Sequence, residues 1–284
     1  MRKSVIGILL LSIVIVGIAL PAGFSAQSGK QVITYGETTY NNQNYKSAVD
    51  SFFNQQAHID VKNVNSKIIT ASDVNKISST ISHKTYSSNQ IYSCAFVDLT
   101  ESGNIKVTVD TSKITTVTAD MYITALKSAG ITNGHIYVTS PVSATGESAL
   151  AGIMSSYEAA TNTTIPEPVK EAATTEIQTE SDIVQKDNVS ADQLTKLVDN
   201  VKVTVQKNNI TDHKTIVNII QNYTINNNIN LSNSSIENLA TSIGGVQSVQ
   251  GQVSNYTNHV TNVIGNNSGG FSLDELFSKL GLRS

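Results

Sequence analysis

The sequence predicts an α+β protein, in which a small mixed β-sheet with packed helices is followed by an all-α C-terminal domain. Three features favour this fold class. Short apolar runs that read as strands fall before residue 140. Between them, apolar residues recur at i, i+3, i+4 and i+7, which is the spacing of an amphipathic helix. After Pro166 and Pro168 only the helical spacing continues, so a domain boundary is predicted there.

The chain is therefore divided into three segments. Residues 1–26 are predicted to be a signal peptide, residues 27–162 an α+β domain, and residues 163–284 a helical domain. The length of the chain suits one large domain or two small ones.

The N-terminus has the three parts of a secretory signal. Arg2 and Lys3 precede an apolar run over residues 5–20, and small residues follow it. Cleavage is expected between Gly23 and Gln27, which places the mature protein outside the cytoplasm, secreted or on the cell surface. The alternative is an uncleaved anchor, and only in that case is the protein expected to contact a membrane, through this segment alone.

The α+β domain begins with a predicted strand over residues 31–36, which ends at Gly36. Residues 41–53 predict a helix, because their apolar members follow the helical spacing. These members are Tyr45, Ala48, Val49, Phe52 and Phe53. A second short helix is predicted over residues 72–78.

Two strands follow in the sequence. Residues 91–99, IYSCAFVDL, are apolar on both faces, which indicates a central strand. Residues 104–110, NIKVTVD, alternate between apolar and polar, which indicates a half-buried strand. Residues 100–104, TESGN, are expected to join the two strands as a hairpin loop.

Thr118 is expected to cap a helix that Gly130 ends. The apolar face of this helix consists of Tyr122, Ala125, Leu126 and Ala129. Residues 135–140, HIYVTS, follow as a strand. Strand, helix and strand in this order predict a right-handed crossover unit.

Capping boxes predict where helices of the C-terminal domain begin. The pairs are Ser190 with Gln193, Ser234 with Glu237, and Ser272 with Glu275. Another helix is expected after Thr211. Residues 239–263 show apolar steps of three and four, which predict a helix packed along one seam. The pair Gly244-Gly245 is expected to bend or weaken it.

Composition narrows the possible partners. The formal net charge is −3, and Arg283 is the single arginine left after residues 1–26. Because arginine is the usual bidentate reader of phosphates and guanines, nucleic acid is not expected as a partner. Cys94 is the one cysteine, so it forms no intrachain disulfide, and its apolar neighbours predict a buried hydrophobe rather than a reactive thiol.

No metal site and no cofactor are predicted. The histidines are scattered, and none pairs with another at i+3 or i+4. They are His58, His83, His135, His213 and His259. A carboxylate pair for glycoside hydrolysis stays open, because Asp98, Glu101 and Asp110 could converge in space. Exposed acids are also ordinary beside a hairpin.

Residues 140–160, SPVSATGESALAGIMSSYEAA, turn from a strand into a helix. A nucleophile elbow would read G-x-S-x-G, but here Leu150 stands at the second glycine and the downstream chain is helical. Ser148 is therefore not predicted to be a nucleophile, and no catalytic residue is assigned. Thr145 and Gly146 could offer backbone N–H groups to an anion, although Glu147 in the same turn would repel it.

A structural helix start is the favoured interpretation of this stretch. Gly146 would allow a close approach or an unusual dihedral angle, and Glu147 would lie in the first helical turn. The buried stripe is predicted to be Leu150, Ile153, Met154 and Tyr157. The candidate residues for a binding site are Thr145, Gly146, Glu147 and Ser148.

N-x-[ST] sequons occur in the second half of the chain, where they could carry glycans if the protein is exported. They begin at Asn162, Asn188, Asn209, Asn222, Asn230, Asn233, Asn255 and Asn266. Chance is the favoured explanation for most of them, because a chain rich in Asn, Ser and Thr forms sequons by composition.

Three segments resemble the YpuA-like family of exported proteins from Gram-positive bacteria and methanogenic archaea. They are VITYGETTYNNQNYKSAVDSFF, TTVTADMYITALKSAGITNGHIYVTSPVSATGESALAGI and VKEAATTEI. The resemblance is strongest over residues 31–53 and 114–176 and implies an exported module. The family has no established activity, so it supplies no catalytic residues.

These observations predict a cell-envelope or surface protein that is a non-enzymatic binding module for an unknown envelope component or protein. The alternative is an extracytoplasmic hydrolase with a cryptic carboxylate or serine site. A deep acidic cleft in the first domain would favour the hydrolase, whereas an exposed apolar groove or seam would favour binding.

Overall fold

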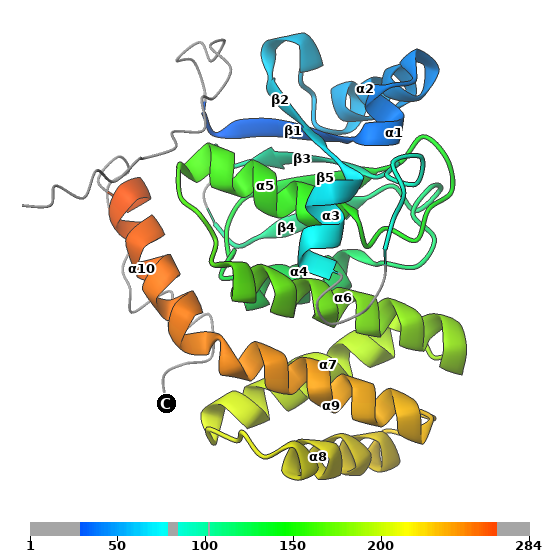
Figure 1. Cartoon of the computed structure of the whole chain (residues 1–284), viewed down its shortest axis with the longest axis vertical. Helices are drawn as coiled ribbons and strands as arrows, with labels where there is room; N and C mark the ends of the chain where they lie inside the picture. The colour runs from blue at the N-terminus through cyan, green and yellow to red at the C-terminus, as the bar shows by residue number, and fades with distance from the viewer. Residues whose placement is uncertain (1–28, 79–84, 102, 266–284) are drawn as a thin grey trace, which may run out of the picture.

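The computed structural model describes residues 29–78, 85–101 and 103–265, and it confirms the predicted α+β class. A five-stranded mixed sheet occupies the first half of the chain, and helices make up the second half (Figure 1). Among the helices described, none is both long and apolar enough to cross a bilayer. The predicted signal peptide lies outside the described residues, as does the helix predicted from Ser272 and Glu275.

The sheet has the strand order β2-β1-β3-β5-β4. The strands are β1 (Gln31–Gly36), β2 (Asn65–Ile69), β3 (Cys94–Asp98), β4 (Lys106–Val109) and β5 (His135–Thr139). The pairs β1–β2 and β4–β5 are parallel, whereas β1–β3 and β3–β5 are antiparallel. The apolar β3 is therefore the central strand, as its sequence predicts.

The hairpin predicted for residues 100–104 does not form, because β5 lies between β3 and β4. Burial explains this order. In β5, Ile136 and Val138 are fully buried, which suits an inner position, whereas β4 carries the exposed Lys106 and takes the edge. The strand–helix–strand unit instead places β4 and β5 side by side in parallel.

The other edge strand, β2, has no counterpart among the sequence predictions. Its residues Asn65, Ser66 and Lys67 are polar, so the strand lacks a continuous apolar run. It is identified by its parallel pairing with β1, which buries Ile69 and leaves Ile68 41% exposed.

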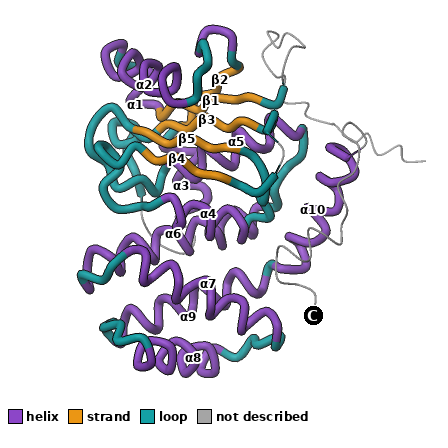
Figure 2. Tube along the Cα trace, turned by 180° about the vertical axis from the view of Figure 1, so that it is seen from behind, coloured by secondary structure: helices purple, strands orange, loops and turns teal. Residues whose placement is uncertain are grey.

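The helices are distributed over both faces of the sheet and beyond it. They are α1 (Glu37–Tyr40), α2 (Gln43–Gln56), the 3₁₀ turn η1 (Val61–Asn63), α3 (Ala71–Ser78), α4 (Ala119–Ser128), α5 (Ala149–Thr161), α6 (Glu167–Asp187), α7 (Ala191–Lys207), α8 (His213–Asn226), α9 (Asn233–Ser248) and α10 (Gln250–Gly265). Figure 1 shows α5 and α3 in front of the sheet, and Figure 2 shows the strands from behind, with α1 and α2 at the β2–β1 end.

Helix α2 covers one face of the sheet through a narrow stripe. Val49 and Phe53 are buried there, and Phe53 contacts Phe96 of β3 with ring centroids 6.2 Å apart. Ala48 is exposed, so the predicted apolar face is too wide by that residue.

The opposite face carries the largest hydrophobic core. It joins α3, α4 and α5 to the sheet and includes all four residues of the predicted α5 stripe. The same core continues into Val169, Ala173 and Ile177 of α6 and into Val253 and Val260 of α10. The separation of two domains at residues 162–163 stays a prediction.

A second core lies among the C-terminal helices and begins at Ile183, near the end of α6. Helix α6 therefore contributes its first half to one core and its end to the other. It packs most extensively against α9 and α4. The helix connects the sheet-bearing part to α7, α8 and α9 (Figure 1).

Two predicted capping boxes do not form. Ser190 occupies the N-cap of α7 without a side-chain hydrogen bond to the helix. Helix α9 begins earlier than Ser234, because Ser232 caps it by accepting a hydrogen bond from the amide of Ser235. Glu237 instead lies 2.8 Å from Nε2 of His213 on α8.

The apolar seam of residues 239–263 is divided between two helices, but the break is not at the glycine pair. Gly244 and Gly245 lie inside α9, and the chain turns at Val249. Val246 and Val253 both pack into the larger core, so tertiary packing places the turn where α10 leaves α9 (Figure 1).

Several asparagines adopt the left-handed conformation that follows the end of a helix. Asn162, Asn188, Asn209 and Asn228 have φ of 51°, 50°, 49° and 53°. Asparagine tolerates this conformation better than most residues, which accounts for three of the sequon positions without a glycan.

Candidate functional site

The turn at residues 145–148 is a structural joint. Gly146 has φ of +109°, and a Cβ atom there would lie 2.7 Å from Cγ2 of Ile114 and 2.8 Å from the Tyr122 hydroxyl. Tyr122 donates a hydrogen bond of 2.5 Å to the carbonyl oxygen of Gly146. The predicted close approach and unusual dihedral angle at Gly146 are therefore confirmed.

Glu147 lies before the helix rather than in its first turn, which corrects the sequence prediction. Helix α5 begins at Ala149, and Glu147 is 5% exposed. Its carboxylate accepts a hydrogen bond of 2.6 Å from the Ser181 hydroxyl of α6 and another from Thr145. The residue thus anchors the turn to α6, because burial makes these hydrogen bonds costly to lose.

Ser148 occupies the N-cap position of α5 in a helical conformation, and its side chain makes no capping hydrogen bond. A serine nucleophile is activated by a general base that is hydrogen-bonded to its hydroxyl. Among the described residues, no such base is hydrogen-bonded to Ser148. Of the four candidate residues, Thr145 and Glu147 are joined by a hydrogen bond, and all four form one turn.

The three carboxylates considered for hydrolysis do not converge. Asp98 is paired in register with His135 at one end of the sheet, where Glu101 lies 3.8 Å from Nδ1 of His135. Asp110 follows the opposite end of β4 and accepts a hydrogen bond from Thr139 at 2.7 Å. The length of β4 separates the two groups.

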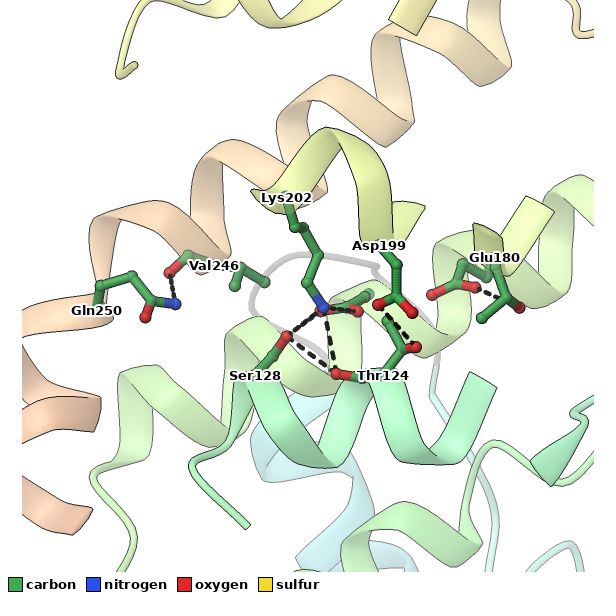
Figure 3. A network of polar contacts seen from close by, with 9 residues as sticks. Thr124, Ser128, Glu180, Asp199, Lys202, Val246 and Gln250 are labelled. Atoms are coloured by element: carbon green, nitrogen blue, oxygen red, sulfur yellow. Dashed lines mark hydrogen bonds and ion pairs between the residues drawn. The ribbon is translucent and has the colours of Figure 1, made fainter. Parts of the chain in front are cut away.

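The interior holds a different cluster of ionisable side chains, where α4, α6 and α7 meet (Figure 3). Lys202 of α7 points between the helices, and its ammonium group lies 2.6 Å from Oε1 of Glu176. It also donates hydrogen bonds to the Ser128 hydroxyl at 2.7 Å and to the Thr124 carbonyl oxygen at 3.2 Å. Ser128 donates to the second carboxylate oxygen of Glu176 at 2.6 Å.

A second buried acid, Glu180, lies one helical turn beyond Glu176. It is fully buried, and the Thr195 hydroxyl donates to it at 3.4 Å. Its Oε1 atom has no hydrogen-bond partner in the described part of the chain. Burial, followed by the charge of Glu176, raises the pKa of Glu180 well above its usual value.

Unlike Glu180, Glu176 has a cationic partner for its carboxylate among the described residues. Burial raises its pKa, while the Lys202 ammonium group and the Ser128 hydroxyl act in the opposite direction. The 2.6 Å contact has the length of a charge-assisted hydrogen bond, which favours the ionised pair.

This cluster does not have the chemistry of a serine–lysine hydrolase. Such a site needs a neutral lysine that can accept the serine proton. Here the Lys202 ammonium group is ion-paired with the Glu176 carboxylate, and the Ser128 hydroxyl donates its hydrogen bond to Glu176 rather than to Lys202. Ser128 is also 3% exposed, so a substrate has no approach to it.

An open cleft of about 250 Å³ lies at the β2 edge of the sheet, among β2, α3, α5 and the start of α6. Ile77, Ala151 and Met154 are among its apolar lining residues. Its charged lining residues are Lys67, Lys76, Lys170, Asp73, Glu158 and Glu167.

Four of the six charged residues of this cleft form ion pairs with one another. Lys170 lies 3.0 Å from Glu158 and 3.4 Å from Glu167. Glu167 also lies 3.3 Å from Lys76, and the carboxylate of Asp73 accepts hydrogen bonds from Thr70.

Lys67 is the one lysine lining the cleft that has no carboxylate partner among the described residues, and Asp73 is its acidic counterpart, held by Thr70 alone. The Lys67 ammonium group donates to the Ser155 hydroxyl at 2.9 Å, and no carboxylate of the described residues lies within 4 Å of it. The cleft therefore presents a cation that is bound by a neutral group.

Comparison with known proteins identifies the family. The family model described as "Protein of unknown function (DUF1002)" matches residues 35–263. The chain belongs to this family. It is also 27% identical over 218 residues to the "Uncharacterized protein YpuA" of Bacillus subtilis (strain 168), covering 75% of this chain and 70% of that protein. No solved structure matches the chain.

The DUF1002 match begins at the last two residues of β1 and includes the other four strands, the buried Glu176–Lys202 cluster and the β2 cleft. Residues 1–28 precede the matched range, so the family match carries no information on the predicted signal peptide. Within the described residues of this DUF1002 chain, no group of three or more His, Cys, Asp or Glu is placed to hold a metal ion.

Cys94 is buried, as its apolar neighbours predict. Burial raises the pKa of its thiol to about 12, so the reactive thiolate is not formed near neutral pH. The amide of Gly36 points at its sulfur atom over 3.4 Å.

Proposed function

We propose that this DUF1002 protein is exported and acts as a non-enzymatic binding protein of the cell envelope or surface. The observation that carries the proposal is the contrast between its two polar clusters. The cluster around Lys202 is buried, and its lysine is ion-paired with Glu176. The cleft at β2 is open and contains Lys67, which donates to the neutral Ser155 hydroxyl and has no carboxylate partner among the described residues. The pattern of residues 1–26 supports export.

Binding is tested by photo-crosslinking in the cells that produce the full-length protein. A photoreactive residue is placed, one at a time, at exposed apolar positions on four different elements, α1, β2, α7 and α8. These positions are Tyr40, Ile68, Val203 and Ile225. The proposal expects a discrete crosslinked product from at least one position, and an excess of purified wild-type protein should compete it away. Absence of a competable product at every position would contradict a binding function.

Export is tested by sequencing the N-terminus of the mature protein. The proposal expects a start between Gly23 and Gln27. Met1 on the envelope-associated form would replace secretion with anchoring.

The hydrolase alternative is tested by treating the purified protein with a fluorophosphonate, which labels activated serines. No stoichiometric labelling is expected, because Ser148 has no aligned base and Ser128 is buried. Labelling that disappears in Ser148→Ala or Ser128→Ala would overturn the non-enzymatic function.

A further inference from the structure

The outer edge of the sheet at β2 is unpaired in the described structure. Strand β2 bonds to β1 along Asn65–Ile69, and none of its backbone groups bonds to any other described element. In a strand, alternate residues direct their N–H and C=O groups to opposite sides, so half of these groups face outward. An edge of this kind is a template for an added strand.

The cleft lies directly under this edge. Lys67 and Ile69 point from β2 toward α5, as the bond from Lys67 to Ser155 shows, and both line the cleft. A strand added beside β2 would direct alternate side chains to the same side. The volume of about 250 Å³ is below the ~300–1,000 Å³ of small-molecule pockets, and it suits one or two side chains.

Charge decides which side chains are suitable. Glu158 and Glu167 are already paired with Lys170 and Lys76, and Asp73 accepts hydrogen bonds from Thr70. Lys67 is the lysine of the cleft without a carboxylate partner among the described residues. A partly buried ammonium group gains most from a carboxylate that also accepts hydrogen bonds. Together Lys67 and Ser155 offer two donors to such a group.

We infer that β2 accepts an extended, acidic peptide segment of a partner protein as a sixth strand of the sheet, with one Asp or Glu side chain bound at Lys67 and Ser155. The inference rests on the proposed binding function and names its surface and partner class. Backbone hydrogen bonds to β2 supply the register-independent part of the affinity, and the carboxylate supplies the preference.

A protective role is the competing explanation for Lys67. Lysines on edge strands also prevent unwanted pairing. The ammonium group of Lys67, however, is turned under the sheet to Ser155 rather than outward from the edge. The two explanations predict opposite effects of removing the Lys67 charge. If the lysine is protective, strand addition increases, and if the lysine binds the partner, strand addition decreases.

The test uses fluorescein-labelled peptides of sequence TVTETVT and TVTKTVT with blocked ends, and anisotropy measured on the purified mature protein. Wild type should prefer the acidic peptide by about tenfold, which corresponds to one charge-assisted hydrogen bond. Lys67→Gln should abolish the preference, and Lys67→Glu should reverse it. The matched control Lys214→Glu makes the same charge change on α8 and should leave the preference intact.

Backbone pairing is tested with N-methylated acidic peptides. Methylation of one alternate set of amides should abolish binding, and methylation of the other set should preserve it, because an added strand turns only alternate N–H groups toward its neighbour. Equal effects of the two sets would overturn the strand geometry.

Two further results would overturn the inference. One is a dissociation constant weaker than about 1 mM for the acidic peptide on wild type. The other is tighter binding of both peptides to Lys67→Gln, which would show that the lysine protects the edge. If either result accompanies a competable crosslink at Val203 or Ile225, which lie on α7 and α8, the binding function stands and its assignment to β2 fails.

Discussion

The ammonium group of Lys202 lies 2.6 Å from the carboxylate of Glu176, and this contact joins α7 to α6 inside the protein. The Lys202 side chain is 16% exposed and that of Glu176 is 1% exposed, so water screens the pair weakly. Ser128 and Thr124 connect the same pair to α4. The contact therefore fixes α7 against α6 and against α4, and α4 in turn packs on β4.

Removing the cation should destabilise the protein strongly. Lys202→Met leaves the Glu176 carboxylate buried without its partner, which costs about 3–5 kcal/mol in the free energy of unfolding. Urea denaturation measures this loss.

The matched control is Lys196→Met on the exposed side of α7, where the change in the free energy of unfolding should stay within about 0.5 kcal/mol. The double variant Lys202→Met with Glu176→Gln should recover part of the loss, because it removes the unpaired charge. Equal losses in Lys202→Met and Lys196→Met would contradict the buried ion pair.

Glu180 should make stability depend on pH in the opposite direction to an ordinary ion-paired acid. Its folded-state pKa is raised above the reference value of 4.5, so above that pH the native state holds a proton that the unfolded chain releases. Stability from this group is therefore present below pH 4.5 and is lost as the pH rises through the folded-state pKa. Glu180→Gln should remove this loss. The free energy of unfolding of this variant, relative to that of wild type, should therefore increase with rising pH.

The measurement is urea denaturation at a series of pH values from 4 upward for wild type and Glu180→Gln. Asp120→Asn, which removes an exposed carboxylate from α4, is the control. A difference between wild type and Glu180→Gln that does not change with pH would show that Glu180 has no raised pKa. If Glu180→Gln and Asp120→Asn changed the pH dependence of the free energy of unfolding equally, the change would not come from the burial of Glu180.

The sequence predicts the sheet-forming segments well where burial is continuous, as in β3, and fails where it is not. Strand β2 has polar residues at three of its five positions, so its pairing with β1 decides its structure. The hairpin prediction failed for a similar reason, because strand neighbours depend on which strand can be buried on both sides.

The buried cluster was missed although a signal for it exists. Glu176 and Glu180 continue the helical spacing of Ala172, Ala173 and Ile177, so the stripe that predicts a buried face contains two acids. Their partner Lys202 lies on another helix, and local spacing cannot identify it. The β2 cleft is hidden for the same reason, since its lining comes from four separate elements.

The linker between α5 and α6 gives a decisive test of the predicted boundary at residues 162–163. Separate domains predict rapid proteolysis near residues 160–168. The side chains of Thr161, Thr163 and Ile165 are buried, and the amide of Ile165 donates to Glu158 at 2.8 Å. Because proteases need accessible, locally unfolded backbone, we expect thermolysin to spare this linker under native conditions.

Mass spectrometry of the early proteolytic fragments measures the outcome. A dominant early cut within residues 160–168 that leaves a folded N-terminal fragment would establish two separable domains instead.

The turn before α5 should tolerate the loss of a hydroxyl and not the loss of its packing. Leu150 is fully buried in the larger core, so Leu150→Ala should reduce the free energy of unfolding by about 2–5 kcal/mol. Ser148 makes no capping hydrogen bond, so Ser148→Ala should cost no more than about 1 kcal/mol.

Gly146→Ala forms the third member of this series and separates backbone geometry from side-chain burial. At φ of +109° its methyl group would meet Ile114 and the Tyr122 hydroxyl at 2.7 and 2.8 Å. Both the dihedral strain, about 1–3 kcal/mol, and the overlap are unfavourable. In urea denaturation we therefore expect Gly146→Ala to lose at least as much free energy of unfolding as Ser148→Ala. The loss in Leu150→Ala should equal or exceed that in Gly146→Ala. A Gly146→Ala variant as stable as wild type would mean that the turn adopts a different conformation, and the anchoring of Glu147 to Ser181 would then lose its structural basis.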